Sequence, residues 1–240
     1  TRIDETVERV VRRAHAGNVY VNRNMVGAVV GVQPFGGEGL SGTGPKAGGP
    51  LYLFRLLAQA PALEQLPVLT ARGPQTLNVA AGQQVLLDGP TGETDQYLLQ
   101  ARGAIWCLPL TVDGLQAQWQ ACQVTGNTLL LQDTPALRAL VAQWQQAQPA
   151  AQAAALHWAD AAQIAQLPLQ AALAESDIDA LLPLQQQLSA RSGPLLLVQG
   201  LTTEEIRSGE RYRQERLLRE ISISTNTTAA GGNASLMMVG

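Results

Sequence analysis

Apolar positions recur every three or four residues over residues 1–16, while acidic and basic side chains fill the positions between them. This spacing predicts an amphipathic helix that ends at Gly17. The following NVYVN predicts a short strand. Next, the stretch from Val29 to Pro50 holds eight glycines and three prolines in 22 residues. The apolar residues 51–57 and a connection, LPVLTARGPQT, then lead to a second region that starts near residue 63.

The second region alternates short apolar runs with stretches of helical composition. The runs predict strands, and the stretches between them predict helices. The strands are Gly103–Pro109, Thr128–Gln132, Ala154–Trp158, Ile178–Leu182 and Pro194–Gln199, and the helices are Leu115–Val124, Pro135–Gln146 and Gln185–Arg191. Alternation at this spacing predicts an α/β fold with a doubly wound parallel sheet.

The pattern changes again near the end of the chain. Thr202–Arg219 is rich in charge and predicts a helix with a capping signal at Thr202 and Thr203. Ile221 and Ile223 then alternate with serines, which predicts an edge strand, and small residues follow to the last position. A tail of this kind either lies in a groove or is a disordered terminus, and the pattern leaves both open.

Composition narrows the classes of function. Apolar residues make up 46% of the 240, enough for a core, whereas charged residues are 15%, below the usual quarter. A net charge of −3 gives no basic field for nucleic acid. Cys107 and Cys122 lie in apolar surroundings, which predicts buried, reduced thiols in a cytoplasmic protein. The chain opens inside a helix and without Met, so we expect a fragment of a longer protein.

The glycine-rich stretch invites a comparison with phosphate-binding loops. The Walker spacing fits Gly39 and Gly44, but Pro45 removes a backbone amide and no hydroxyl follows Lys46. The dinucleotide fingerprint fits from Gly37 onward, but no strand directly precedes it. The phosphate interpretation is therefore disfavoured, and the pattern favours a substrate-clamping loop and a structural crossover equally.

No self-contained active site is visible in the sequence. The two histidines, His15 and His157, belong to unrelated elements, and neither has a cysteine or carboxylate motif beside it. We expect His15 to be a surface or helix-end residue and His157 to be packed in a strand. The common zinc and serine-hydrolase motifs are absent from the sequence. We therefore expect no catalytic residue and no metal ligand in this chain.

Two motifs resemble a known family. GNVYVNRNMVGAVVGVQPFGGEGLSGTGPKAGGP closely resembles the C-terminal end of the aldehyde dehydrogenase superfamily, and its second half is similar to the L-glutamate-γ-semialdehyde (pyrroline-5-carboxylate) dehydrogenase branch. The tail TNTTAAGGNASLMMVG resembles the terminus of the proline utilization A family, bacterial bifunctional enzymes with proline dehydrogenase and semialdehyde dehydrogenase on one chain. The motifs together cover residues 1–58 and 219–240.

The region between the motifs resembles the extra C-terminal domain of the longer family members, a Rossmann-like copy of the aldehyde dehydrogenase cofactor half. Gln132, followed by Asp133, stands where the superfamily has a lysine for the nucleotide ribose. The turn that matches the glycine-rich pyrophosphate site falls at residues 182–184 and has no glycine. The resemblance therefore implies a degenerate, non-catalytic domain that does not bind NAD.

The resemblance also implies the substrate-binding residues. Semialdehyde dehydrogenases hold the substrate's α-carboxylate on the backbone N–H groups of an anchor loop, whose positions match Gly27 and Ala28. A glycine lets the loop turn its amides inward, and a small neighbour leaves room for the carboxylate. Phe35 matches the aromatic that packs on the aliphatic part of the substrate, and a core plug is the alternative role. Lys46 is expected to be solvated.

For the whole enzyme, the resemblance implies oxidation of proline to glutamate through glutamate semialdehyde. An upstream cysteine thiolate attacks the aldehyde, hydride passes to NAD and water releases glutamate, while FAD serves the proline dehydrogenase. This fragment is expected to be inactive alone and to bind neither NAD nor FAD. Its expected partners are the upstream dehydrogenase domains and glutamate semialdehyde, not nucleic acid. The implied location is cytoplasmic, with the full-length enzyme peripheral to the inner membrane through quinone reduction.

The resemblance divides the chain into three parts. Residues 1–62 are the end of the semialdehyde dehydrogenase domain, 63–218 the degenerate domain, and 219–240 a tail with an edge strand and a covering segment. The degenerate domain and the tail are expected to close the tunnel between the two active sites. Two alternatives stay open for the middle part, which are an independent nucleotide- or partner-binding regulatory module and an oligomerisation domain.

Overall fold

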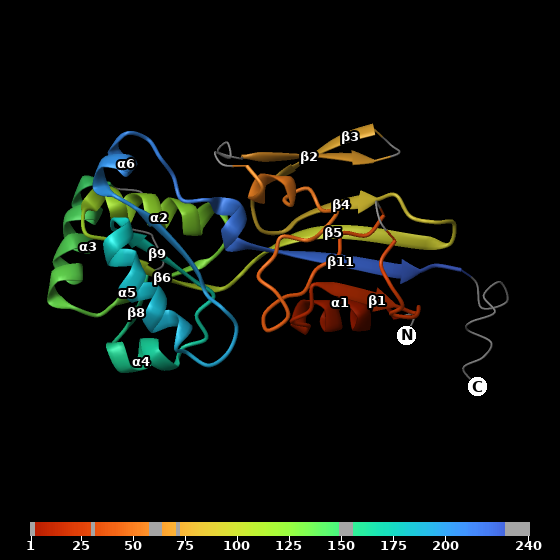
Figure 1. Cartoon of the computed structure of the whole chain (residues 1–240), viewed down its shortest axis with the longest axis horizontal. Coiled ribbons are helices and arrows are strands. Elements are labelled where there is room, and N and C mark those ends of the chain that lie inside the picture. Colours follow the sequence, from red (N-terminus) through yellow and green to blue (C-terminus); the bar gives the residue numbers. More distant parts are fainter. Residues whose placement is uncertain (1–2, 30–31, 58–63, 71–72, 149–155, 229–240) are drawn as a thin grey trace.

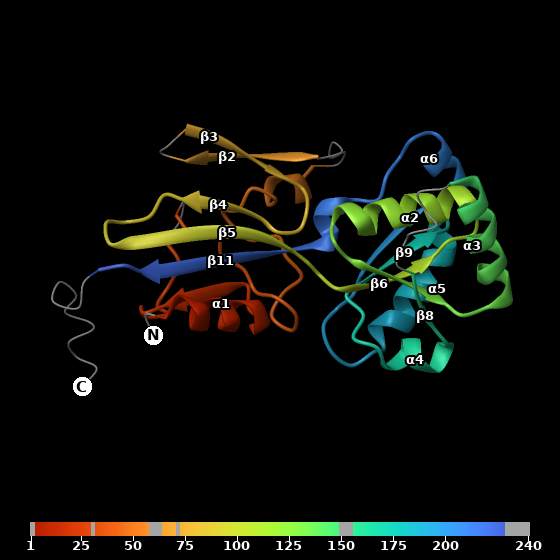
Figure 2. The ribbon, with the colours of Figure 1, turned by 180° about the vertical axis from the view of Figure 1, so that it is seen from behind.

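The structure is a computed structural model that describes residues 3–29, 32–57, 64–70, 73–148 and 156–228. Two lobes lie side by side along the long axis of the molecule (Figure 1), and Figure 2 shows the same lobes from behind. The first lobe holds the described residues up to 101 together with residues 218–228. The second lobe holds residues 102–217, so the chain passes between the lobes twice.

The first lobe is built on a four-stranded sheet. Its elements are α1 (Asp4–Arg13), β1 (Asn18–Val21), the 3₁₀ helix η1 (Leu53–Arg55), β2 (Gln65–Thr70), β3 (Gly73–Asn78), β4 (Gln83–Leu87), β5 (Glu93–Ala101) and β11 (Leu218–Asn226). The order of strands in the sheet is β1-β11-β5-β4. β1 runs parallel to β11, and the other neighbours are antiparallel. The predicted first helix and first strand are confirmed.

Both faces of this sheet are covered. Leu66 and Val68 of the β2–β3 hairpin pack with Tyr97 of β5 on one face. Val11 of α1 packs with Ile221 of β11 on the other. In Figure 1 the hairpin lies next to β4 and α1 lies next to β1. Burial of these apolar side chains from both sides gives the lobe its core.

The segment LPVLTARGPQT is not a connection, as predicted, but the paired strands β2 and β3. Its alternation is that of a strand, because Leu66 and Val68 are buried while Pro67 and Leu69 are exposed. The prolines and the glycine suggested a loop. The hairpin stands apart from the main sheet, and a two-stranded edge tolerates proline because its outward N–H groups are not needed for pairing.

β11 was predicted at an edge but lies inside the sheet, between β1 and β5. Ile221 and Ile223 are buried on the α1 side, and Ser222 and Ser224 are also buried on the opposite side. The alternation of isoleucine and serine identified the strand correctly. It was misread as an edge because small hydroxyl residues usually face water. The predicted helix before it is also too long, since α6 covers only Thr203–Arg207.

The second lobe contains an all-parallel, five-stranded sheet. Its elements are β6 (Ala104–Leu108), α2 (Val112–Val124), β7 (Thr128–Gln132), α3 (Pro135–Ala147), β8 (His157–Ala159), α4 (Ala161–Gln166), β9 (Ala171–Glu175), α5 (Ile178–Ser189), β10 (Leu197–Leu201), α6 and the 3₁₀ helix η3 (Gln214–Leu217). The strand order is β10-β9-β6-β7-β8. Numbered along the chain this is 5-4-1-2-3, so the predicted Rossmann-like, doubly wound α/β fold is confirmed.

Helices cover both faces of the parallel sheet. α2 and α3 supply Leu115, Cys122 and Trp144 to the core of one face. α4 and α5 supply Ile164 and Leu188 to the other. The thiols of Cys107 and Cys122 are free and buried, with their Sγ atoms 4.0 Å apart, and burial raises the pKa of Cys107. The prediction of buried, unpaired thiols is confirmed.

The predicted strand Ile178–Leu182 is wrong, because these residues begin helix α5. Asp177 caps this helix by accepting a hydrogen bond from the Ala180 amide at 2.9 Å. The fourth strand of the sheet is instead β9, whose five residues are all buried. Its sequence, AALAE, has no β-branched residue, so intrinsic preference pointed away from a strand.

Candidate functional site

The predicted anchor residues lie on an exposed loop that follows β1. Gly27 has a φ of +70°, a conformation that favours glycine, and no atom lies within 4 Å of where its Cβ would be. Gly27 is exposed and Ala28 half-buried. The surface at Gly27 is therefore open to a ligand. The joint role of Gly27, Ala28 and Phe35 stays a prediction.

Phe35 is held by its backbone while its side chain is 53% exposed. Its amide donates to the Ala47 carbonyl at 3.0 Å, and its carbonyl accepts from the Ala47 amide at 2.9 Å. This two-way bridge closes the glycine-rich loop, defined here as residues 33–50. An exposed phenylalanine on a fixed backbone is not a core plug. Its exposed ring is available for contact with a partner surface or a substrate.

The prediction that Lys46 is solvated is wrong. Its side chain is almost fully buried, at 2% exposure, under the glycine-rich loop. Its Nζ donates to Asn18 Oδ1 at 3.0 Å and to the Gly36 carbonyl at 2.8 Å. Burial lowers the pKa of Lys46 to about 8, against the opposing attraction of Glu220 and Glu38. Lys46 therefore fastens the loop to β1 from the inside.

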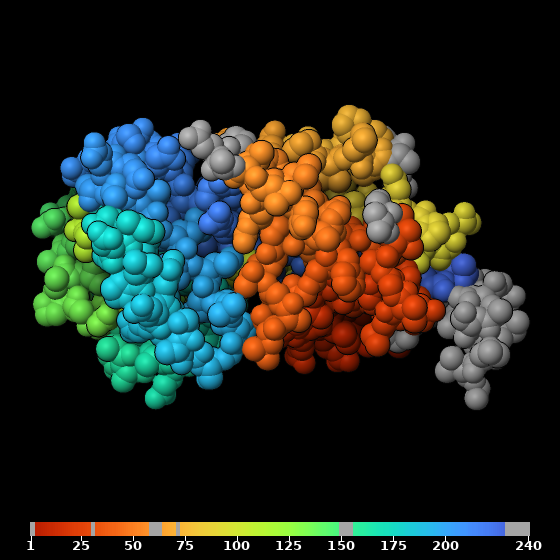
Figure 3. All heavy atoms as spheres, in the orientation of Figure 1, coloured from red at the N-terminus to blue at the C-terminus, as the bar shows by residue number. Residues whose placement is uncertain are grey.

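Glu220 of β11 fastens the same loop from the other direction. Its carboxylate accepts from the Lys46 amide at 2.8 Å and from the Tyr97 hydroxyl at 2.7 Å. Burial raises the pKa of Glu220, while the hydrogen bonds and the charges of Lys46 and Arg102 oppose the rise. Arg102 reaches across to the Thr43 carbonyl at 3.0 Å. Figure 3 shows the orange atoms of this part of the chain next to the blue and cyan atoms of the second lobe.

The second candidate site is the carboxyl end of the parallel sheet, where the strand order reverses between β6 and β9. Doubly wound sheets bind nucleotides in the crevice at this switch point, with phosphate at the following helix N-terminus. Here that helix is α2, which Thr111 caps by accepting from the Gly114 amide at 3.0 Å. The crevice is the place where a cofactor would have to fit.

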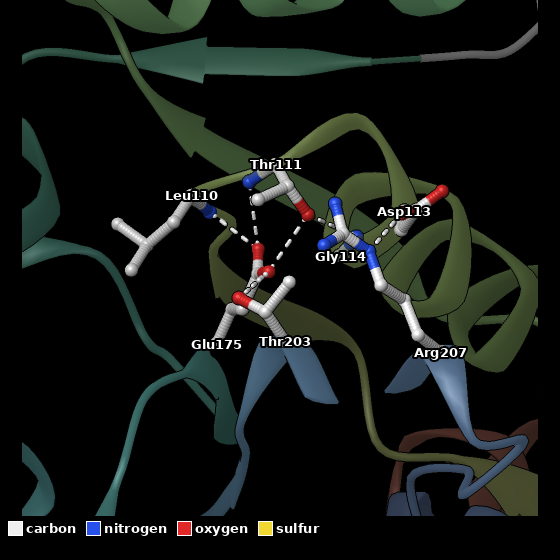
Figure 4. A network of polar contacts seen from close by, with 7 residues as sticks. All are labelled: Leu110, Thr111, Asp113, Gly114, Glu175, Thr203 and Arg207. Carbon is white, nitrogen blue, oxygen red and sulfur yellow. Dashed lines mark hydrogen bonds and ion pairs between the residues drawn. The ribbon is translucent and has the colours of Figure 1, made fainter. Parts of the chain in front are cut away.

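The carboxylate of Glu175, at the end of β9, fills this position (Figure 4). It accepts hydrogen bonds of 2.7 Å from the amides of Leu110 and Thr111 and from the hydroxyls of Thr111 and Thr203. Burial raises the pKa of Glu175, but these bonds outweigh it and lower the pKa overall. The Glu175 carboxylate thus occupies the position at the N-terminus of α2 where other doubly wound folds bind phosphate.

This arrangement does not fit NAD. A Cβ on Gly114 would lie 1.9 Å from a Glu175 oxygen, so the carboxylate occupies even the close-approach position of the helix start. A pyrophosphate would have to displace a charged, fully hydrogen-bonded group and meet like charge. Residues 182–184, assigned to this turn from the sequence, lie instead inside α5. The assignment was wrong because β9, not Ile178–Leu182, is the strand.

A hollow of about 430 Å³ lies beside the switch point, at the ends of β6 and β7. Its lining includes Trp106, Leu110, Leu137 and Gln132, the residue predicted to replace the ribose-binding lysine. The next residue, Asp133, forms an exposed, two-pronged ion pair with Arg138 at 2.9 Å, and hydrogen bonds from Arg138 lower the pKa of Asp133. Neither Gln132 nor Asp133 offers the positive charge that a lysine would present to the ribose.

The histidines do not build a site. His15 is exposed beyond the end of α1, as predicted, and His157 lies in β8 but is exposed rather than packed. Among the described residues, His, Cys, Asp and Glu form no group of three that could hold a metal ion. None of the described helices combines the length and apolar character that a bilayer crossing requires.

The sequence of this chain is similar to those of known proteins. The model of the aldehyde dehydrogenase family matches residues 1–59. The chain is 42% identical over its whole length to the bifunctional protein PutA of Rhizobium meliloti, of which it covers 21%. It is 55% identical over 53 residues, 22% of its length, to 1-pyrroline-5-carboxylate dehydrogenase 1 of Halalkalibacterium halodurans, of which it covers 10%.

A solved structure of proline utilization A (PutA) from Corynebacterium freiburgense is similar in fold, with a TM-score of 0.50 and 15% identity. The similarity covers 96% of this chain and 22% of that structure's chain. The chain therefore matches the C-terminal region of the bifunctional PutA proteins. It spans about a fifth of the length of the curated relatives that it matches along its whole length.

Proposed function

We propose that this chain is the C-terminal part of a bifunctional enzyme that oxidises proline to glutamate. The observation that carries the proposal is the match over the whole chain to PutA, combined with the match of the aldehyde dehydrogenase family model to residues 1–59. In this proposal residues 1–59 belong to an NAD-dependent glutamate semialdehyde dehydrogenase. The catalytic residues and the NAD and FAD sites lie upstream, and the fragment alone is inactive.

Within that enzyme, Gly27 and Ala28 hold the substrate α-carboxylate and Phe35 covers its aliphatic part. The exposed, open position of Gly27 and the exposed ring of Phe35 support these roles. An anion is bound well by successive N–H groups, and the aldehyde end stays free to meet an upstream nucleophile.

The second lobe has a structural role in this proposal. Glu175 occupies the phosphate position of its fold, which supports a domain without a nucleotide. The lobe is joined to the dehydrogenase end through the pairing of β1 with β11. A groove of about 1090 Å³ between α1 and the sheet, whose lining includes both Gln96 and Gln100 and the apolar Leu98, offers a mixed polar and apolar surface to upstream domains. The lobe and the tail close the tunnel between the two active sites, in a cytoplasmic enzyme that is peripheral to the inner membrane.

Gly27→Ala in the complete protein tests the anchor. An alanine at a φ of +70° is strained by about 1 kcal/mol or more, so the loop shifts its amides. The expected result is a several-fold rise in KM for glutamate semialdehyde with KM for NAD unchanged.

Gly48→Ala is the matched control, because Gly48 has a φ of +71° and an equally open surrounding, but lies outside the anchor. Equal kinetic effects of the two variants, or none in Gly27→Ala, would remove the anchor role. A complete protein that does not oxidise the semialdehyde would remove the proposed function itself.

A further inference from the structure

The backbone on either side of Phe35 is fixed by side chains rather than by loop contacts alone. The Pro34 carbonyl accepts from Asn18 Nδ2 at 3.0 Å and from the Ser222 hydroxyl at 2.7 Å. The Gly36 amide donates to Asn18 Oδ1 at 3.1 Å. The residues next to Phe35 are thus bonded to β1 and β11, while its own ring remains exposed.

Ser222 is well suited to hold this position. It is 3% exposed in the interior strand β11, and its amide donates to the Gly17 carbonyl at 2.9 Å. Its neighbours across the sheet are Asn18 on β1 and Tyr97 on β5. A hydroxyl locked by two strands is pre-organised, so the Pro34 carbonyl cannot move without losing a buried hydrogen bond.

Gln33, the residue before Pro34, is also buried, at 4% exposure. Its Oε1 accepts from the Val29 amide at 3.0 Å, and its Nε2 donates to Asp95 Oδ1 at 3.3 Å and to Glu93 of β5. The Gln33 amide also donates to the Val29 carbonyl at 3.1 Å. The backbone just before Phe35 is therefore bonded to β5 through Gln33 and to β11 through Pro34.

We infer that Ser222, 187 positions after Phe35, is a positioning residue for substrate binding, acting through the Pro34 carbonyl to set the height and direction of the Phe35 ring. This inference rests on the proposed function, in which Phe35 covers the substrate. It assigns to the last described strand a part in the geometry of a site whose direct contacts all lie in residues 27–35.

The test uses Ser222→Ala in the complete protein, with Ser224→Ala as the matched control. Ser224 lies on the same strand and face and is 2% exposed, and no hydrogen bond joins its side chain to the described part of the glycine-rich loop. For Ser222→Ala we expect KM for glutamate semialdehyde to rise about three- to tenfold, as for the loss of one net hydrogen bond. We expect kcat and KM for NAD to stay within about twofold and Ser224→Ala to leave KM for the semialdehyde unchanged.

Ser222→Cys keeps the shape of the side chain but offers only a weak hydrogen-bond donor. It therefore tests the bond to the Pro34 carbonyl even if Ser222→Ala folds poorly. It should raise KM in the same direction. A rise in KM of the same size in Ser224→Ala, or a fall in kcat with KM unchanged in both Ser222 variants, would show a structural role only and overturn the inference. Unchanged KM in Ser222→Ala and Ser222→Cys, together with a raised KM in Gly27→Ala, would overturn it while leaving the proposed function in place.

Discussion

Lys46 shows how a single residue links the pH of the solution to the stability of the first lobe. It is the only lysine in the sequence, and burial lowers its pKa from 10.5 to about 8. Between these values the unfolded chain holds a proton that the folded chain has released. The free energy of unfolding contributed by Lys46 therefore rises with pH across this window and is constant below it.

Two measurements check this prediction. A chain carrying ¹³C-labelled lysine should give one side-chain Cε resonance that titrates near pH 8, whereas a solvated lysine titrates near 10.4. In urea unfolding, the stability of the wild type relative to Lys46→Met should increase from pH 8 to pH 10.5. A resonance that titrates above pH 10, or a constant stability difference, would contradict the buried, desolvated position.

The residues that the sequence misjudged depend on partners far along the chain. Lys46 stands among glycines and was expected in solvent, but its amide is bound by Glu220, 174 residues later. The role of Glu175 could not be predicted from the surrounding AALAES, because its carboxylate binds the amides of Leu110 and Thr111, which lie far away in the sequence. By contrast, Gly27, Ala28 and Phe35 were predicted from the motif that surrounds them, and their role in substrate binding stays a prediction. Local chemistry is visible in a sequence, whereas burial by a distant strand is not.

At the scale of elements, α1, α2, α3 and several strands followed from periodicity and capping, and the errors at β9 and α5 share one cause. Thr202 begins α6 with a capping box, as its sequence signal indicated. β9 was not predicted, because an alanine-rich strand lacks β-branched residues, and the start of α5 was predicted as a strand, because a leucine-rich helix start looks like a buried strand. Tertiary burial overrides intrinsic preference in such short segments.

The interior position of β11 changes what truncation of the tail should do. Ending the complete protein before Ile221 removes a strand bonded to both β1 and β5. We expect loss of semialdehyde oxidation itself, because the sheet that carries the glycine-rich loop cannot form. Ending the protein after Thr228 keeps β11 whole and should leave that activity, but introduce a lag in NADH formation from proline.

Progress curves with proline and with added glutamate semialdehyde separate the two effects. The variant ending after Thr228 serves as the control for the shorter one. Normal semialdehyde oxidation without residues 221–240 would contradict the structural part of β11. A variant without residues 229–240 that shows no lag would contradict the covering role of the tail.

At the scale of the whole molecule, two lobes with different sheets are fastened at the places where the chain crosses between them. Arg102 donates to the Arg216 carbonyl at 2.8 Å and to the Thr43 carbonyl at 3.0 Å. The first bond joins the outgoing and returning segments of the chain, and the second joins the second lobe to the glycine-rich loop of the first. The lobes therefore share a polar junction rather than a simple linker.

Because the Glu175 carboxylate occupies the crevice between β6 and β9, we expect that the chain does not bind NAD. Calorimetric titration of NAD into residues 1–240 should give no saturable heat, and pyrophosphate should behave the same way, because Glu175 already satisfies the amides of Leu110 and Thr111. Saturable binding would favour the alternative of a nucleotide-binding module. The mass of the chain in solution, measured in the same samples, addresses the alternative of an oligomerisation domain.

The pairing of Asn18 with Ser222 also has a consequence for synthesis on the ribosome. The ribosome must translate about 200 more residues after β1 before β11 is complete, which takes on the order of 10–40 s at the usual rates of translation. During that interval β1 lacks the neighbour that β11 supplies, and a nascent chain released early never acquires it. Completion of the polypeptide thus becomes a condition for assembling the aldehyde-binding end, and prematurely terminated products should be recognised by chaperones and proteases as unfolded.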